Sequence, residues 1–279
     1  MPEHLAPPLS VWPTGQHDPF AQLRETGLLP GTETDLERIP PAVAAHTIAT
    51  YTHLGDLVLD PDCGAGTVLS EALRAGRQAF GLTADRRWWT LARANVTAAK
   101  RAGAWRDGSV LDARPKALET VRAAGLSGRV GLILTAVRTA SGRMAGPGDD
   151  PIKSTVANLT TTLRCCEPLL RSGGHVAVVA QPYRRSDDSL VDLTTRLVAA
   201  STAAGLVLVD RCIALTAELR DSRLVTRASL VERRRSARTS GFPTSLVAHR
   251  EVLVFQRAHD VELAAAAVEV GAPGWRRAA

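Results

Sequence analysis

This chain of 279 residues lacks several features that would place it in a class at once. No run approaches the roughly 18 uninterrupted apolar residues of a membrane-spanning helix. The first residues, MPEHLAPPLSVWPTGQ, lack the basic start and apolar stretch of a signal peptide. Only four cysteines are present, and they fit no metal-ligand spacing (Cys63, Cys165, Cys166 and Cys212). We therefore expect a cytoplasmic protein with reduced thiols, no metal and no membrane segment.

The charge balance is moderately basic. Lys and Arg number 34 against 28 Asp and Glu, a net charge of +6 with a pI near 9.7. This balance is compatible with a polyanionic partner such as DNA or RNA, although an Arg- and Ala-rich composition is also typical of a GC-rich genome. Apolar residues make up 45% of the chain, enough for a sizeable core in one α/β domain with extra segments, or in two small domains.

Short apolar strands alternate with helical stretches along most of the chain. The strand candidates are 56–60, 78–83, 108–111, 130–135, 175–180, 206–214 and 250–257, and the helical candidates are 41–52, 67–75, 86–102, 115–124, 153–170 and 188–204. This alternation predicts right-handed βαβ units and an α/β fold whose parallel sheet is covered on both faces. No good helix separates the last two strands, so they are expected to pair as an antiparallel hairpin at the sheet edge.

Three segments depart from this regular pattern. Residues 1–40 are rich in Pro, Gly and Thr and are expected to form an irregular arm over a domain spanning 41–258. The Ala-rich tail 259–279 is expected to be frayed or flexible. An insertion, 218–249, precedes the last strand, and the stretch 218–250 holds eight arginines against three acids. This basic segment is either a phosphate-contacting surface or a solvated loop.

The most informative stretch is LVLDPDCGAGTVLSEAL, residues 57–73, whose pattern indicates a strand, a glycine turn and a helix. A nucleoside triphosphate loop needs Lys-Ser or Lys-Thr after its last glycine, but Thr67 and Val68 follow Gly66. A dinucleotide loop needs three glycines spaced G-x-G-x-x-G, and Leu69 occupies the third position. These departures argue against a phosphate loop and against a nicotinamide-dependent oxidoreductase.

S-adenosylmethionine is the remaining ligand that suits such a turn. Its methionine part carries an ammonium and a carboxylate, and Gly64 and Gly66 let the backbone approach that part closely. Asp60, at the end of the strand, suits the cationic end of the cofactor, directly or through water. The helix N-terminus after Gly66 favours the carboxylate. The sequence therefore predicts an S-adenosylmethionine site at this turn.

The turn VLDPDCGAGTVLSEAL resembles motif I of the amino-methylating DNA methyltransferases, the N4-cytosine/N6-adenine type, and of their RNA-modifying relatives. Their form is D-P-F/M-x-G-x-G-T followed by a helix with an acid–alanine pair, matched here by Glu71 and Ala72. The similarity extends in element order over 40–257, including LLRSGGHVAVVA and the closing HREVLVFQR. The sequence is more similar to the DNA methylase-like proteins of actinomycetes than to the classical restriction-modification enzymes. It implies a Rossmann-like class I methyltransferase fold, with a mostly parallel seven-stranded sheet and an antiparallel last strand. The cofactor residues that it implies in this turn are Asp60, Pro61, Cys63, Gly64, Gly66 and Thr67.

Two further cofactor contacts are ambiguous. The second strand should end in an acid that binds both ribose hydroxyls, but Thr83 stands at that position. Asp85, two residues later, either substitutes for this acid or only caps the following helix. Asp112, after the third strand, matches the residue that reads the adenine amino group, although it could also be a helix cap. Thr83, Asp85 and Asp112 complete the candidate cofactor site.

The largest departure follows the fourth strand, where the family places [DSN]-P-P-[YFW] to hold the target amine and stack on the flipped base. Here the tetrad is replaced by Thr135-Ala136-Val137-Arg138. No proline, aromatic ring or obvious amine acceptor remains, and Arg138 brings a cation toward a nitrogen that must lose a proton. After the fifth strand, an amide, a proline and a ring occur together, as a substitute or as an ordinary turn (Gln181-Pro182-Tyr183). The catalytic residues are therefore unknown.

Two functions remain open. The first is S-adenosylmethionine-dependent methylation of a nucleic acid, by direct in-line transfer in which positioning of the acceptor carries most of the rate. The second is a catalytically inactive relative that binds cofactor or nucleic acid in a regulatory role, with the basic segment as its working surface. Elsewhere, Asp149 and Asp150 are expected to form a turn, and His249 to be structural.

Overall fold

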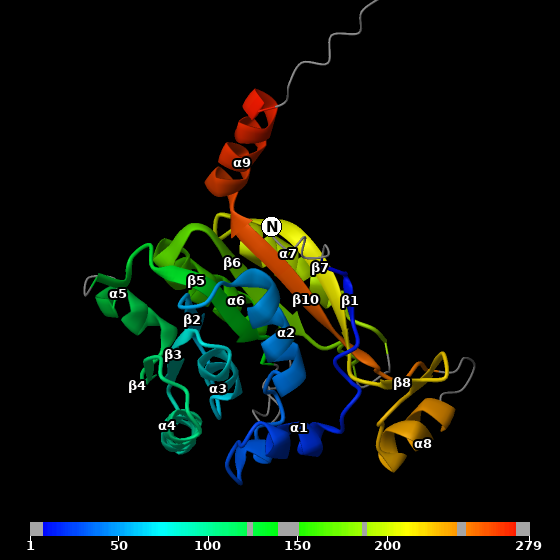
Figure 1. Ribbon diagram of the computed structural model, residues 1–279. Coiled ribbons are helices and arrows are strands. Elements are labelled where there is room, and N and C mark those ends of the chain that lie inside the picture. The colour runs from blue at the N-terminus through cyan, green and yellow to red at the C-terminus, as the bar shows by residue number, and fades with distance from the viewer. Residues whose placement is uncertain (1–7, 122–124, 139–150, 186–188, 239–243, 272–279) are drawn as a thin grey trace, which may run out of the picture.

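The computed structural model describes residues 8–121, 125–138, 151–185, 189–238 and 244–271 (Figure 1). Its centre is an eight-stranded sheet in the order β1-β7-β10-β6-β5-β2-β3-β4. The strands are β1 (Val11–Trp12), β2 (Leu57–Asp60), β3 (Gln78–Thr83), β4 (Gly108–Asp112), β5 (Val130–Ala136), β6 (Leu170–Ala180), β7 (Leu206–Leu215) and β10 (His249–Arg257). β10 is antiparallel to its neighbours β6 and β7, whereas the other pairs in this sheet are parallel.

This order confirms the fold class that the sequence predicts. Without β1 the sheet has seven strands, and from β2 the chain winds outward in two directions, to β3 and β4 on one side and to β5 and β6 on the other. Such a doubly wound sheet of parallel strands has a ligand crevice where the strand order reverses. The antiparallel β10 is the last strand, as expected. The chain therefore has the Rossmann-like class I methyltransferase fold.

The predicted antiparallel hairpin of the last two strands is confirmed, and the two-residue β1 is added outside it. β7 and β10 pair antiparallel, from His249 opposite Leu215 to Arg257 opposite Leu206, and β10 is the inner strand, between β6 and β7. The reason is the apolar sequence of β10: residues 252–255 are all fully buried, and a strand that is apolar on both faces belongs inside a covered sheet. The edge beyond β7 is completed by β1, which the sequence pattern did not reveal.

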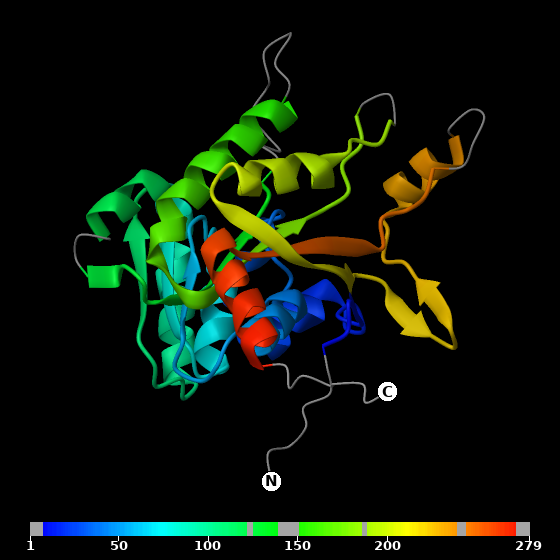
Figure 2. The ribbon, with the colours of Figure 1, turned by 90° about the horizontal axis from the view of Figure 1, so that it is seen from above.

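Helices cover both faces of the sheet (Figure 2). One face carries α2 (Pro41–Tyr51), α3 (Thr67–Arg74) and α4 (Arg86–Arg101), and the other carries α5 (Leu118–Val121), α6 (Pro151–Cys166) and α7 (Leu193–Thr202). Because successive side chains of a strand point to opposite faces, Leu132 and Leu134 of β5 join the core under α2 and α3. Ile133 joins the core on the other face, together with Leu163 of α6.

Residues 8–40 contain regular elements, in contrast to the irregular arm expected from their composition. Besides β1, the structure has helix α1 (Pro19–Glu25) and the short 3-10 helix η1 (Thr32–Thr34). Asp18 caps α1 by accepting hydrogen bonds from the backbone N–H groups of Phe20 and Ala21. Trp12 is buried, and its indole N–H donates to the Leu9 carbonyl. This arm is therefore a packed part of the molecule.

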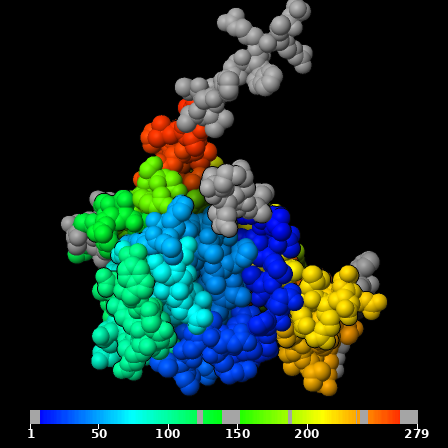
Figure 3. All heavy atoms as spheres, viewed as in Figure 1, coloured from blue at the N-terminus to red at the C-terminus, as the bar shows by residue number. Residues whose placement is uncertain are grey.

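Two other segments also form elements. The basic insertion contains β8 (Glu218–Arg220), β9 (Arg223–Val225) and α8 (Leu230–Arg238), and it forms a lobe at the side of the body (Figure 3). The start of the tail forms α9 (Ala258–Gly271), for which its alanines have a high intrinsic propensity. The division into arm, domain and tail itself stays a prediction. In the described parts of the chain, no helix is long and apolar enough to cross a membrane.

Candidate cofactor and acceptor site

The glycine turn lies where the strand order reverses. β2 ends at Asp60 between β3 and β5, and the turn then leads into α3 at the carboxyl edge of the sheet. The N–H of Cys63 donates to the Leu82 carbonyl of β3 over 2.8 Å, and the N–H of Gly66 donates to the Cys63 carbonyl over 2.7 Å. The backbone therefore fixes the turn at the edge where ligands bind in doubly wound sheets.

The two glycines of the turn face different surroundings. Both have positive φ, +48° at Gly64 and +82° at Gly66, a region that other residues rarely adopt. A Cβ at Gly66 would lie 2.9 Å from the Cβ of Ala92, so this glycine allows α3 and α4 to pack closely. A Cβ at Gly64 would overlap the carboxylate of Asp35 and the guanidinium of Arg138. Of the two glycines, Gly64 is the one that faces the ligand side of the turn.

An ion pair between Asp35 of the arm and Arg138, just after β5, occupies the side of the turn that Gly64 faces. Arg138 Nη1 lies 2.9 Å from Asp35 Oδ1 and Nη2 lies 3.3 Å from Oδ2, so the contact is bidentate. Arg138 Nε donates to the Asp62 carbonyl at 3.2 Å and lies 3.4 Å from Asp62 Oδ2. Asp35 also accepts a hydrogen bond of 3.0 Å from the N–H of Ala65, inside the turn. The Asp35 side chain is 3% exposed and that of Arg138 19%, so the pair is largely removed from solvent.

Asp60 is buried close to this pair. Its Oδ1 accepts a hydrogen bond from the N–H of Asp62 at 3.1 Å. Burial raises the pKa of Asp60 to about 8; the charge of Arg138 works against this rise, and that of Asp62 adds to it. At neutral pH the carboxyl group of Asp60 is therefore largely protonated, which makes it a weaker partner for a cation than its place in the motif suggests.

A second polar cluster fastens the arm to the turn. Asn95, buried in α4, donates from Nδ2 to the Ala65 carbonyl and to the Thr32 hydroxyl, each over 2.9 Å. Its Oδ1 accepts from the N–H of Leu29 at 2.8 Å. Neither Asn95 nor Asp35 belongs to a recognisable motif, so the sequence carried no signal that they meet at the turn. Arg138 was singled out as a departure, but its partners were not foreseen.

The remaining turn residues contact the protein's own core. Pro61 is buried. Cys63 packs against Gly81, where a Cβ would lie 3.0 Å from its Sγ, and burial raises the pKa of its thiol well above the ordinary value. Thr67 begins α3, and its buried hydroxyl has no hydrogen-bond partner among the described residues. Their assignment to the cofactor stays a prediction.

The candidates on β3 and β4 lie side by side. Thr83 is buried and stands opposite Asp112 in the parallel register. Asp85 caps α4: its Oδ1 accepts from the backbone N–H groups of Arg87, at 2.8 Å, and Trp88, at 3.3 Å. Asp112 is exposed at the end of β4. The capping role of Asp85 is thus visible in the structure, whereas ribose binding by Asp85 and adenine binding by Asp112 stay predictions.

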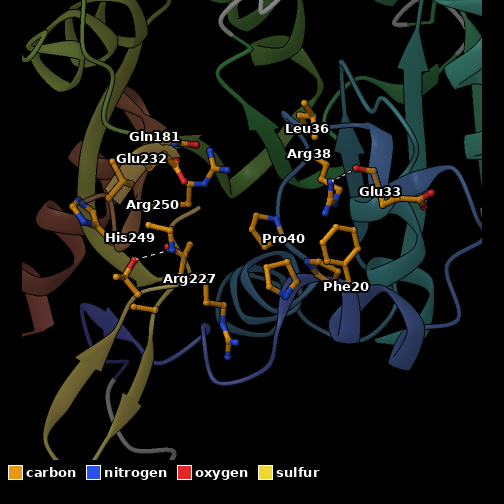
Figure 4. Close-up of a pocket in the computed structure, with 17 residues that line it drawn as sticks. Phe20, Glu33, Leu36, Arg38, Pro40, Gln181, Arg227, Glu232, His249 and Arg250 are labelled. Carbon is orange, nitrogen blue, oxygen red and sulfur yellow. Dashed lines mark hydrogen bonds between the residues drawn. The ribbon is translucent and has the colours of Figure 1, made fainter. Parts of the chain in front are cut away.

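The residues that replace the tetrad point in two directions. Arg138 turns toward the glycine turn, whereas Val137 lines a cavity of about 230 Å³ together with Gln181, Tyr183 and Arg250. A second cavity, of about 290 Å³, shares Gln181 and Arg250 with the first (Figure 4). The structure thus brings the segments TAVR and QPY, far apart in the sequence, to one place at the carboxyl edge.

The shared wall of these cavities carries a positive charge. Burial and, to a smaller extent, the charge of Arg38 lower the pKa of Arg250 to about 10, and the charge of Glu37 works against this shift. In Figure 4, Gln181, Arg250 and His249 lie along one wall, and Arg38 lies on the opposite side. His249, expected to be structural, begins β10 beside Arg250. Glu33, Glu37 and Glu232 also line the two cavities, so their lining carries charges of both signs.

The glycine turn has the chemistry that the amino-acid part of S-adenosylmethionine requires. The N–H of Ala65 points to an anion, Asp62 accepts from a cation, and Gly64 leaves room for both. In the structure the anion is the carboxylate of Asp35 and the cation is the guanidinium of Arg138. The turn therefore offers an N–H to a carboxylate and a carbonyl oxygen to a cation, and in this structure the Asp35–Arg138 pair uses both.

Comparisons with known proteins gave similarity at the level of structure. No protein-family model matches the sequence, and no curated protein matches it. A TehB-like S-adenosylmethionine-dependent methyltransferase from Corynebacterium glutamicum is 16% identical, covering 77% of this chain and 86% of its own, with a TM-score of 0.41. An S-adenosylmethionine-dependent methyltransferase from Methanosarcina mazei is 13% identical (76% and 96% covered, TM-score 0.47). The protein TYW2 of M. jannaschii, in complex with AdoMet, is 12% identical (76% and 74% covered, TM-score 0.43). At such low identity and TM-score these similarities decide nothing about activity, and the fold rests on the strand order itself.

The basic lobe contains both paired and unpaired arginines. Arg220 and Arg227 lie 2.8 Å and 3.5 Å from the carboxylate of Glu218. The side chains of Arg223 and Arg234 are exposed and form no hydrogen bond or ion pair within the described residues. The predicted turn at Asp149 and Asp150 lies outside the described residues. Within the described ranges, no group of three or more His, Cys, Asp or Glu residues could hold a metal ion.

Proposed function

We propose that the chain is an S-adenosylmethionine-dependent methyltransferase that binds its cofactor at the glycine turn and its acceptor in the cavity beside Gln181. The single observation that carries this proposal is the place of the turn. It lies at the reversal of strand order, with the bare face of Gly64 and the N–H of Ala65 directed to the ligand side. An anion-binding N–H and a neighbouring acid suit the carboxylate and the ammonium of the cofactor.

When bound, S-adenosylmethionine supplies a methyl group on a sulfonium. The N–H of Ala65 binds the cofactor's carboxylate, and the half-exposed Asp62 binds its ammonium. Thr83 and Asp112, which are adjacent in register, are the residues that we assign to the ribose and the adenine. On the acceptor side Gln181 orients the acceptor by hydrogen bonding, and the ring of Tyr183 packs against it. Because in-line transfer depends mainly on positioning, these residues need not include a strong base.

A nucleic acid is the acceptor that we propose, in keeping with the resemblance to amino-methylating DNA methylases. The exposed arginines Arg223 and Arg234 of the basic lobe provide phosphate contacts. Arg250 adds a positive charge inside the acceptor cavity itself.

The thiols of all four cysteines are free, which supports a reducing compartment, the cytoplasm.

A second function is favoured by a specific observation. Because Asp35 and Arg138 already hold the ligand side of the turn, a relative that has lost methyl transfer and works through its basic lobe would have this structure too. The two functions differ in one measurable property. A methyltransferase transfers the labelled methyl group of S-adenosylmethionine to an acceptor, whereas the inactive relative binds without transfer.

The test is a calorimetric titration of the full chain with S-adenosylmethionine, followed by a methyl-transfer screen over DNA, RNA and small acceptors. We expect saturable binding by the wild type, weakened by Asp62→Ala. Thr97→Ala, on the exposed face of α4, is the control that leaves the turn intact. Binding by neither the wild type nor a variant without the Asp35–Arg138 pair would contradict the proposal. Binding without transfer to any nucleic acid would favour the inactive relative.

A further inference from the structure

The ion pair at the glycine turn resembles a ligand in its contacts. Asp35 presents a carboxylate to the Ala65 N–H, and Arg138 presents a cation beside Asp62. These two charges, held 2.9 Å apart at their nearest atoms, are also the two charges of an amino acid. The turn therefore already binds a carboxylate and a cation, supplied from two distant parts of the chain.

Both residues of the pair belong to segments outside the turn. The backbone of Asp35 is fixed in the arm, since its N–H donates to the Thr32 carbonyl at 3.2 Å and Arg38 Nη1 donates to its carbonyl at 2.6 Å. Arg138 follows β5, two residues beyond its last residue Ala136. All three nitrogens of its guanidinium make contacts with Asp35 or Asp62. The pair is thus a built feature of the fold and not a chance surface contact.

Gly64 shows how closely the pair is seated. Both the Asp35 carboxylate and the Arg138 guanidinium lie within the space that a Cβ at this residue would fill. A glycine with positive φ at this point keeps the backbone open to a ligand, and here the ligand comes from the chain itself. An external amino-acid group cannot reach the same face of the turn while the pair remains.

We infer that Asp35 and Arg138 are an internal mimic of the amino-acid part of S-adenosylmethionine, which competes with the cofactor for the glycine turn and so sets its affinity. This inference rests on the proposed function. A ligand that binds only the open form has its affinity reduced by the fraction of molecules in that form. Cofactor binding is accordingly coupled to a movement of the arm around Asp35, away from Ala65.

The arm connects this competition to the acceptor cavity. Leu36 and Arg38, on either side of Glu37 and directly after Asp35, line the larger cavity. A movement that withdraws Asp35 from the turn therefore also moves part of the cavity wall. Acceptor binding and cofactor binding are thus expected to influence each other through one short segment.

The test compares two probes on the folded full chain. S-adenosylmethionine carries the amino-acid part, whereas 5′-methylthioadenosine has the same nucleoside and sulfur without it. Affinities are measured by calorimetry for the wild type, for Arg138→Ala and for the double variant Asp35→Ala/Arg138→Ala, which leaves neither charge of the pair without its partner. Melting curves and circular dichroism confirm that each variant is folded.

We expect S-adenosylmethionine to bind the double variant at least about tenfold more tightly than the wild type, which corresponds to an open fraction of about a tenth or less in the wild type. The affinity for 5′-methylthioadenosine should change by less than about twofold, because this probe has no amino-acid part to reach the space that the pair occupies beside Gly64. An unchanged or weaker affinity for S-adenosylmethionine would overturn the inference, since the pair would then not compete. An equal gain for both probes would also overturn it, because the pair would then block the whole pocket.

The outcome also separates this inference from the proposed function. If 5′-methylthioadenosine binds every form and the variants leave S-adenosylmethionine binding unchanged, the cofactor site stands and the mimic is rejected. If neither probe binds any form of the protein, the cofactor site itself is rejected, and the mimic with it.

Discussion

Asn95 donates a hydrogen bond from its side-chain amide to the carbonyl of Ala65 over 2.9 Å. The N–H of the same residue, Ala65, donates in the other direction to Asp35 at 3.0 Å. One residue of the glycine turn is therefore held by α4 through its carbonyl and by the arm through its N–H. The shape of the turn depends on two segments distant in sequence, and each contact can be removed separately.

The first prediction concerns Asn95. Asn95→Ala removes three hydrogen bonds and leaves the buried carbonyl of Ala65 and the partly buried N–H of Leu29 without their partner. Each unsatisfied buried group costs about 1–3 kcal/mol, so we expect a loss of roughly 2–4 kcal/mol in the free energy of unfolding. Urea denaturation measures it. Thr97→Ala, exposed on the same helix, should change stability by less than about 0.5 kcal/mol; equal losses in both variants would refute the role of Asn95.

The second prediction separates close packing from backbone strain at Gly66. Gly66 and Gly205 have the same φ of +82°, but a Cβ at Gly205 meets no atom within 4 Å. Gly205→Ala should therefore cost only the strain of a left-handed residue, about 1–2 kcal/mol. Gly66→Ala places its Cβ 2.9 Å from the Cβ and 3.0 Å from the Cα of Ala92. We expect it to cost about 1–3 kcal/mol more, the usual price of overpacking, in parallel denaturation curves.

The sequence predicted most strands and helices of this molecule well, because these elements follow from periodic patterns of apolar residues. The seven predicted strands and the turn after β2 depend on local apolar runs, which fix which residues are buried. The antiparallel pairing of β10 with β7 was predicted, but the apolar pattern did not show which of the two strands is the inner one. β1 was missed for a related reason: two residues, Val11 and Trp12, are too few to show a period.

The candidate site was predictable only in part. The spacing of the motif predicts Asp60 and the glycines, whereas Asp35 and Asn95 become part of the site through tertiary packing alone. Asp85 illustrates a different limit: an acid two residues after a strand suits both a ribose and a helix cap. The sequence left these alternatives open, and the contacts of Asp85 with Arg87 and Trp88 show the cap.

The third prediction is a dependence of stability on pH. Burial raises the pKa of Asp60 to about 8 and that of Glu71 to about 7, both above their values near 4 in the unfolded chain. Between about pH 4 and the raised pKa of each group, the folded state binds more protons than the unfolded state. The contribution of each group to stability therefore falls as the pH rises through this range. The slope is about 1.4 kcal/mol per pH unit for each group, and it ends near pH 7 for Glu71 and near pH 8 for Asp60.

The variants that test this slope are Asp60→Asn and Glu71→Gln. Each replaces a carboxyl group by a neutral amide of similar shape and should remove its own part of the pH dependence. Denaturant curves at a series of pH values from 4.5 to 8.5 would show it as a flatter profile, with the Asp60→Asn effect persisting to the higher pH. If the variants had the same profile as the wild type over this range, both carboxylates would be ionised in the folded protein.

The fourth prediction decides between the two roles considered for Asp85. Asp85→Ala should cost about 1 kcal/mol through loss of the cap, whereas Asp85→Ser, which can still accept from the Arg87 N–H, should retain most of the stability. If Asp85 only caps α4, the affinity for S-adenosylmethionine should be the same in both variants and in the wild type. A loss of affinity in Asp85→Ser, whose helix is still capped, would instead assign the carboxylate to the ribose.

The fifth prediction concerns the basic lobe, in whose described part Arg223 and Arg234 have exposed and unpaired side chains and are the clearest candidates for phosphate contacts. Each phosphate neutralised by a protein cation contributes about 0.9 to the salt dependence of binding to duplex DNA. The double variant Arg223→Gln/Arg234→Gln should therefore lower the slope of log affinity against log salt by about 1.8, with weaker binding at low salt. Fluorescence anisotropy with a labelled duplex over a range of salt concentrations measures this slope. Arg101→Gln, on the exposed surface of α4 at the other end of the sheet (Figure 1), removes the same kind of charge and should leave the slope unchanged. If both variants lowered the slope equally, binding would depend on net charge alone, and the lobe would be a solvated surface with no special part in recognition.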